Sequence, residues 1–142
     1  MAAEYTYPLV QTVAADENIL FTNGSRCCRK GLISHNENSG IFRLKAAPNT
    51  CRTIYKVQYD GNIAVATGGT VGPISIALTQ NGEVLRNAVA TVTPAAVGNF
   101  FNVTVATFIE ITCGCCDTIT VENISDTAID VINSNLIIER VA

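Results

Sequence analysis

The chain of 142 residues is poor in charge and contains no tryptophan. Charged residues make up 15% of it, whereas about 25% is typical of soluble domains. No apolar run reaches the roughly 18 residues that a transmembrane helix needs, so we expect no membrane partner. The first residues lack a basic region followed by an apolar one, so we also expect no secretory signal.

Motifs for catalysis and for cofactor binding are missing as well. The sequence contains no G-x-x-x-x-G-K loop, no dinucleotide fingerprint and no H-E-x-x-H. The single histidine, His35, lies in a turn-rich run, and nothing nearby indicates a helix N-terminus or an oxyanion hole beside a reactive thiol. We therefore predict that the protein is not an enzyme and holds no cofactor.

The net charge of −3 conceals an uneven distribution along the chain. Residues 1–56 carry seven of the nine Lys and Arg but only four of the twelve Asp and Glu. Because the basic residues are few and tryptophan is absent, we expect no nucleic-acid partner. The cationic part could face an acidic surface on a neighbouring subunit or an underlying protein, and ordinary solvated charge is the alternative.

What the chain does contain is typical of an all-β protein, with 48% hydrophobic residues and abundant Val, Ile, Thr, Asn and Gly. Residues 99–111 alternate between apolar and polar, and Asn81-Gly82 is a strong hairpin signal. Strands are expected at 5–13, 18–22, 31–35, 41–44, 52–66, 74–80, 88–93, 99–111, 118–122, 128–132 and 135–141. This pattern predicts one domain, residues 1–142, folded as a sandwich or jelly roll, with residues 1–12 as first strand or arm.

The last expected strand is apolar on both faces, because Leu136, Ile137 and Ile138 follow one another. One face fits the core of the same subunit. The other face needs a partner, since soluble chains rarely expose such a strand. Together with the low charge, this predicts an obligate oligomer that associates through β-sheets.

Six cysteines are many for a chain without an expected export signal: Cys27, Cys28, Cys51, Cys113, Cys115 and Cys116. A protein that folds inside a cell and later works outside it, as a virion protein released by lysis does, would reconcile the two. At least one disulfide, buried free thiols and a bound metal all stay open. The C-x-x-C of Cys113 and Cys116 has no second motif of that spacing, so we assign no metal site.

Four phrases of the sequence resemble small proteins encoded in phages and prophages of Gram-positive gut bacteria. They are GTVGPISIAL at 69–78, NGE at 81–83, VTPAA at 92–96 and NSNLIIERV at 133–141. The strand order is also similar to tumour-necrosis-factor-like jelly rolls, including the C-terminal domains of collagen-like spore-surface proteins. The resemblance covers residues 50–142 well and the first 50 poorly. It implies a two-sheet antiparallel jelly roll that assembles as a compact homotrimer.

In such folds, four long strands form an apolar inner sheet around a threefold axis. The resemblance places residues 5–13, 52–60, 99–111 and 135–141 in this sheet. The implied candidates for the trimer interface are Tyr7, Ala106, Phe108, Ile137 and Val141. The alternative for Phe108 is that it fills a corner of the subunit's own core.

The same topology implies that the turn before Arg52 and the turn after Ile111 lie at one end of the sandwich. Cys51 would then lie near the later cysteines, which implies a disulfide from Cys51 to Cys115 or Cys116. Such a bridge closes a long loop and would stabilise the fold by about 4 kcal/mol in the chain-entropy model. Cys27 and Cys28 could supply another partner.

The expected function is structural. The resemblance implies a virion protein, either a trimeric capsid decoration or cement protein or part of a head fibre, whose partner is the major capsid protein or another virion protein. The N-terminal residues or a loop end would dock on the shell. The alternative is a trimeric adhesion or carbohydrate-binding tip on a phage fibre or on a bacterial or spore surface, against which the small number of aromatic residues weighs.

Overall fold

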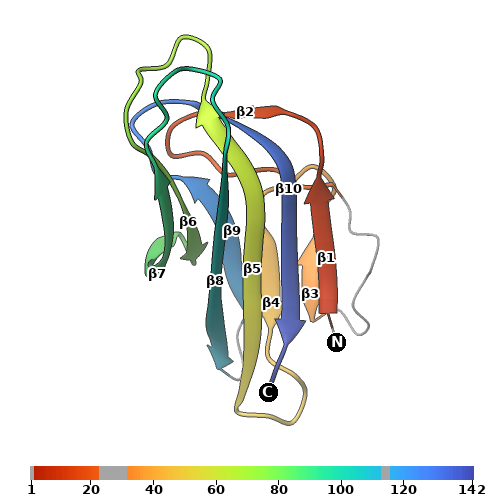
Figure 1. Cartoon of the computed structure of the whole chain (residues 1–142). Helices are drawn as coiled ribbons and strands as arrows, with labels where there is room; N and C mark the ends of the chain where they lie inside the picture. Colours follow the sequence, from red (N-terminus) through yellow and green to blue (C-terminus); the bar gives the residue numbers. More distant parts are fainter. Residues whose placement is uncertain (1, 23–31, 113–115) are drawn as a thin grey trace.

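Two antiparallel sheets of five strands each form the protein in the computed structural model, which describes residues 2–22, 32–112 and 116–142 (Figure 1). Sheet A contains β1 (Ala2–Tyr7), β2 (Gln11–Val13), β5 (Arg52–Val65), β8 (Phe101–Thr112) and β10 (Ile129–Arg140). Sheet B contains β3 (Ile33–His35), β4 (Phe42–Lys45), β6 (Ile74–Gln80), β7 (Glu83–Val92) and β9 (Cys116–Asn123). The predicted two-sheet jelly roll is confirmed. None of the described segments forms a helix of the length and apolarity that crossing a bilayer requires.

The four strands predicted for the inner sheet do lie side by side, in the order β1-β10-β5-β8. On β10, Leu136 pairs with Tyr59 of β5, which in turn pairs with Val105 of β8. All three side chains are buried and point into the space between the two sheets. The alternation read from the sequence therefore assigns the core side of these strands correctly.

The first predicted strand is two strands in the structure, because Pro8 interrupts it. Proline has no N–H to donate, so a chain that pairs along one neighbour is broken there. β1 pairs with the second half of β10, where Ala2 lies opposite Glu139. β2 pairs with the first half of the same strand, where Val13 lies opposite Ile129. Both pieces belong to sheet A (red in Figure 1).

The last two predicted strands, by contrast, are one continuous strand, β10. Asn133 has a φ of 59° and lies where the pairing with β5 shifts, between Ile132 and Asn135. Asparagine tolerates this left-handed conformation better than most residues, so the Asn-Ser-Asn sequence forms a bulge that joins the two predicted strands. β10 consequently spans the whole height of sheet A.

The predicted hairpin at Asn81-Gly82 is confirmed. Asn81 has a φ of 53° and Gly82 a φ of 84°, and the two-residue type I′ turn requires both to be positive. The return strand, β7, starts at Glu83 and so is longer than predicted. Its pairing with β6 is irregular between Ala77 and Thr79, which hides the start of the strand in the sequence pattern.

The core lies between the two sheets and is rich in aromatic contacts. The ring of Phe42 on β4 meets the ring of Tyr5 edge-on, with 4.7 Å between the ring centres. It also meets the ring of Phe21 edge-on, with 5.4 Å between the ring centres. Tyr59 of β5 is fully buried, and its hydroxyl lies 3.1 Å from that of Ser134. Gly61 leaves room for this ring, because a Cβ there would lie 2.3 Å from the Tyr59 hydroxyl oxygen.

One buried amide side chain, that of Asn123, ties the two layers together at the end of β9. Its Nδ2 donates to the carbonyls of Val13, Ala14 and Thr127, at 3.1, 3.2 and 3.0 Å. Its Oδ1 accepts from the amide of Ser125 at 2.9 Å. The segment after β2 and the loop before β10 are thus fixed to one side chain.

Candidate interaction surfaces

The side chains of sheet A that point away from the core form a surface across four strands, here called the outer face of sheet A. The pairing registers align these side chains in rows from β10 across β5 to β8. The rows are Glu139–Lys56–Phe108, Ile137–Gln58–Ala106 and Asn135–Asp60–Thr104. This surface is the one that the sequence predicts to meet other subunits.

On one half of this face, apolar side chains alternate with the polar Lys56, Gln58 and Glu139. We call these apolar residues the apolar patch: Ile54, Ala106, Phe108, Ile137 and Val141. Phe108 is 67% exposed and Val141 45% exposed. The amide of Val141 donates to the carbonyl of Ile54 at 2.8 Å, which keeps the chain end beside β5. Because Phe108 is exposed, the alternative that it fills a corner of the subunit's own core is wrong. The patch leaves a large aromatic ring in solvent.

The other half of the outer face of sheet A is polar, which corrects the expectation of an apolar surface throughout. Asp60 Oδ1 accepts from Asn102 Nδ2 at 3.0 Å and from Thr104 Oγ1 at 3.1 Å. Next to them, Asn62 Nδ2 donates to Asn133 Oδ1 at 3.2 Å. These residues satisfy one another, whereas the apolar patch leaves Phe108 and Val141 exposed beside the charged Lys56 and Glu139.

Tyr7 does not join the other four interface candidates. On β1 it shares its side with Ala3 and Tyr5, which face the core, and it is half-buried. It lines an apolar hollow of about 420 Å³ together with Pro8 and the exposed Leu9. The structure thus brings Ala106, Phe108, Ile137 and Val141 to one face and Tyr7 to another.

The loop before Arg52 and the end of β8 lie at one end of the sandwich, as predicted. Arg52 of β5 pairs with Thr112 of β8, and Lys45 of β4 pairs with Cys116 of β9. Cys51, which precedes Arg52, and Cys116 are therefore both at this end. It is the lower end of the molecule in Figure 1. The prediction that the loop before Arg52 and the end of β8 lie at the same end of the sandwich is therefore confirmed.

The disulfide implied for Cys51 is not present in this structure, where the Cys51 thiol is exposed and free. Its other candidate partner, Cys115, lies outside the described residues, as do Cys113, Cys27 and Cys28. A bridge in the mature protein stays a prediction. Within the part of the chain that the structure describes, no group of three His, Cys, Asp or Glu could hold a metal ion.

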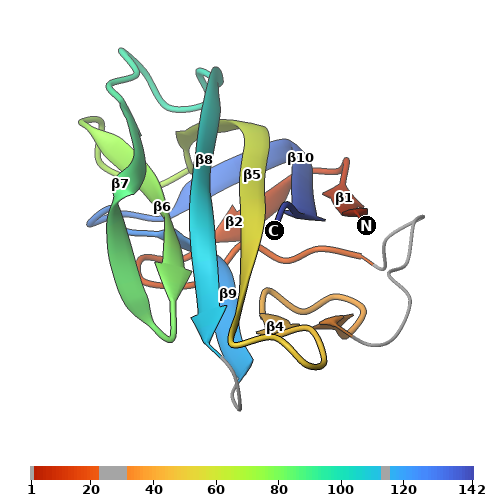
Figure 2. The same ribbon diagram turned by 90° about the horizontal axis from the view of Figure 1, so that it is seen from below.

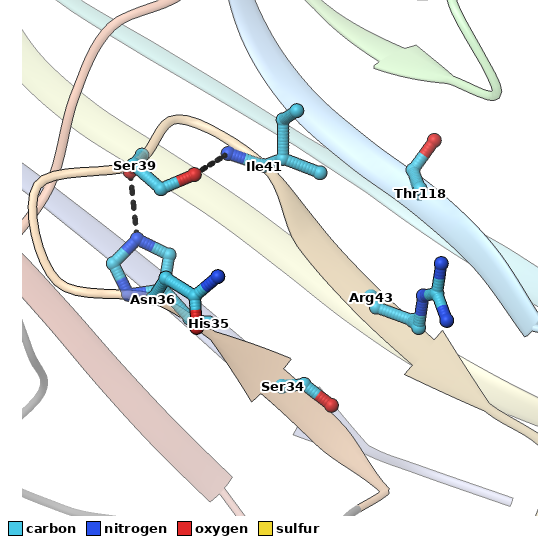
Figure 3. A pocket seen from close by; sticks show the side chains of 7 residues that line it. All are labelled: Ser34, His35, Asn36, Ser39, Ile41, Arg43 and Thr118. Carbon is cyan, nitrogen blue, oxygen red and sulfur yellow. Dashed lines mark hydrogen bonds between the residues drawn. The ribbon is translucent and has the colours of Figure 1, made fainter.

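A polar pocket of about 350 Å³ opens on the side of sheet B that faces away from the core (Figure 3). It lies over the β3–β4 hairpin and the start of β9, and Arg43 is its one charged residue among those that line it. The lining residues are Ser34, His35, Asn36, Ser39, Ile41, Arg43 and Thr118. The sequence indicated only that Arg43 belongs to a basic segment. It gave no sign of the pocket, whose residues come from three strands.

His35 lines this pocket at the β3–β4 turn, and its ring packs against the core. Its ring stacks on Phe42 at 4.3 Å and meets Tyr5 edge-on at 4.9 Å. Nε2 donates to the carbonyl of Ser39 at 2.7 Å, so Nδ1 carries no proton in the neutral ring, and Nδ1 is buried with no partner among the described residues. Burial lowers the pKa of His35 below its ordinary value of 6.5, and the bond to Ser39 opposes this only in part. The ring is therefore held neutral.

Acidification should weaken the fold through His35. Because its pKa is lower in the folded chain, the unfolded chain binds more protons between that pKa and 6.5. Above pH 6.5, His35 should not reduce the free energy of unfolding. As the pH drops from 6.5 to the lowered pKa, the free energy of unfolding should fall. Denaturant unfolding of the wild type and of His35→Phe across this range checks it, because the variant should lack that slope. Equal slopes in both proteins would contradict the prediction.

Comparison with known proteins identifies the fold. No family model matches the chain, and no curated protein sequence matches it. Among solved structures, Eiger TNF from S. frugiperda is similar over 100% of this chain and 92% of its own, with 13% identity and a TM-score of 0.71. Murine APRIL is similar over 99% of this chain and 100% of its own, with 12% identity and a TM-score of 0.69. The fold is therefore a tumour-necrosis-factor-like jelly roll.

Proposed function

We propose that this protein is a structural subunit that assembles as a homotrimer and decorates or cements a phage capsid, or forms part of a head fibre. The observation that carries the proposal is the apolar patch on the outer face of sheet A. Phe108 is largely exposed there, one row away from Ile54 and Ala106. Large apolar side chains that are exposed close together on a sheet face typically mark an association site in soluble proteins.

Docking on a shell is assigned to the loop end of the subunit. Loops 66–73 and 93–100 lie next to each other at the end opposite to the chain termini (Figure 1). Neither loop contains a charged residue, and both expose apolar side chains, including Val71, Val97 and Phe100. A contact made by such loops depends on shape and apolar burial, as the cores of stable protein interfaces do. The phage-like phrases of the sequence favour a capsid as the partner.

The assembly state is tested first. Sedimentation over a wide dilution series should give a species of three chain masses that persists at low concentration. Obligate interfaces typically bury about 2,000 Å² or more, which keeps subunits together on dilution. A stable single-chain species would overturn the trimer and remove the physical basis of the capsid role.

Attachment to shells is tested with purified capsids and a loop variant. Phe100→Ser should leave the trimer intact and weaken its binding to capsids, because the apolar contact is lost while sheet A is unchanged. Electron microscopy of particles should show wild-type trimers on the shell or on a head fibre. Trimers that bind host cells or glycans and leave capsids bare would favour the adhesion alternative.

A further inference from the structure

Arg43 occupies the centre of the pocket on sheet B, between two hydroxyl side chains. Ser34 of β3 pairs with Arg43 of β4, which pairs with Thr118 of β9. All three therefore stand in one row on the side of the sheet that faces away from the core. Figure 3 shows the guanidinium between the Ser34 and Thr118 side chains.

The charge of Arg43 is not neutralised within the described chain. Among the described residues the one ion pair joins Arg52 to Glu110, at 3.6 Å. No carboxylate lines the pocket, whose other residues are uncharged or, in the case of His35, held neutral. A planar guanidinium presents paired donors that match a carboxylate with two parallel hydrogen bonds. The cation in this pocket thus favours a ligand with a carboxylate.

The rest of the lining suits a ligand with several hydroxyls. Ser34, Asn36 and Thr118 can each donate and accept a hydrogen bond. Ile41 is 51% exposed at the rim and offers an apolar contact beside these polar groups. A lone peptide carboxylate would use the arginine and leave this set of donors and acceptors unmatched. A sugar ring, polar at its edge and apolar on its C–H face, would use both.

The pocket is also shaped before any ligand arrives. The β3–β4 turn is fixed by the bond from His35 Nε2 to the Ser39 carbonyl and by the Ile41 amide, which donates to Ser39 Oγ at 3.1 Å. His35 is in turn stacked on the buried Phe42. A preformed site loses less conformational entropy on binding.

We propose that this pocket binds an acidic monosaccharide, with the carboxylate on Arg43 and ring hydroxyls on Ser34, Asn36 and Thr118. The volume of about 350 Å³ lies at the small end of the range for ligand sites, as one sugar ring requires. The site goes beyond the structural role proposed above. It does not depend on the trimer, because its residues lie on sheet B and the apolar patch lies on sheet A.

The test titrates isotope-labelled full-length protein with D-glucuronate, D-galacturonate and N-acetylneuraminate, followed by NMR. At least one of them should bind and shift the amide signals of residues 34–43 and 118. Arg43→Gln should weaken that binding about tenfold or more, the expected loss of one charge-assisted contact. D-glucose should bind about tenfold more weakly than D-glucuronate for the same reason.

Arg86→Gln is the matched control, because Arg86 is an exposed arginine on β7 and its removal changes net charge equally. It should bind the acidic sugar as the wild type does. Failure of all three acidic sugars to bind overturns the proposal, as does unchanged affinity of Arg43→Gln or an equal loss in Arg86→Gln. Acetate binding as tightly as the sugars would show a simple anion site and would overturn the sugar assignment.

Discussion

Replacing Phe108 with lysine should abolish the trimer while each subunit stays folded. Phe108 is 67% exposed, so the subunit's own core does not depend on it. It lies directly opposite Lys56 on the outer face of sheet A, and like charges opposite one another on a sheet repel. In a trimer, three such pairs would be taken out of water near the axis. An unpaired charge buried at an interface costs about 3–5 kcal/mol.

Sedimentation and circular dichroism together check this prediction. Phe108→Lys should sediment as a single chain and keep the β-sheet spectrum of the wild type. Val89→Lys is the control, because Val89 is an exposed apolar residue on β7 whose side of the sandwich is opposite to the apolar patch. That variant should remain trimeric. If Phe108→Lys also remains trimeric, the apolar patch is not the subunit interface.

Replacing Asn123 with aspartate should strongly destabilise the fold. The two side chains have the same shape, so no cavity forms. The Nδ2 that donates to the carbonyls of Val13, Ala14 and Thr127 becomes an oxygen that faces the same three acceptors. Asn123 is fully buried, and breaking such a network around a buried charge typically costs about 3–5 kcal/mol.

Urea unfolding at equal protein concentration measures this loss, since stability depends on concentration in an oligomer. Asn87→Asp is the control: Asn87 is exposed on β7 and its Nδ2 donates to Thr107 Oγ1 alone, at 3.1 Å. Exposed changes of this kind usually alter stability by about 0.5 kcal/mol or less. Similar losses in both variants would mean that the network around Asn123 contributes little.

The strands of sheet A show how far the sequence predicts the fold. The alternation in residues 99–111 predicts that Ala106 and Phe108 lie on the face away from the core, and the structure has them there. Alternation depends only on neighbours along the chain, so it survives in the sequence. The Asn81-Gly82 turn was predictable for the same reason, because the positive φ angles that the turn requires belong to those two residues alone.

The errors concern strand continuity, which depends on pairing partners. Pro8 divides one predicted strand into β1 and β2, which both pair with β10. Asn133 forms a bulge inside β10, where the sequence predicts that one strand ends and another begins. Both residues suit a turn as well as an irregularity in a sheet, and only the neighbouring strand decides between these. The polar half of the outer face of sheet A was missed because Asp60, Asn102 and Thr104 become partners only after β5 and β8 pair.

The pocket on sheet B could not be predicted from the sequence for a similar physical reason. Ser34 and Arg43 are close in the chain, but Thr118 joins them through the pairing of β4 with β9. A binding site that is assembled across three strands has no fixed spacing in the sequence. Tyr7 stays an untested interface candidate: on β1 it shares its side with Ala3 and Tyr5, so it lies over a hollow and not beside the apolar patch.

The antiparallel pairing of β1 with β10 brings the two chain ends to the same pole of the molecule, with Ala2 opposite Glu139 (Figures 1 and 2). An affinity tag or a fluorescent reporter joined to either end therefore emerges on the side away from the uncharged loops. Immobilising the protein through such a tag on a sensor chip would present those loops to the solution, so that capsids and other analytes meet them first.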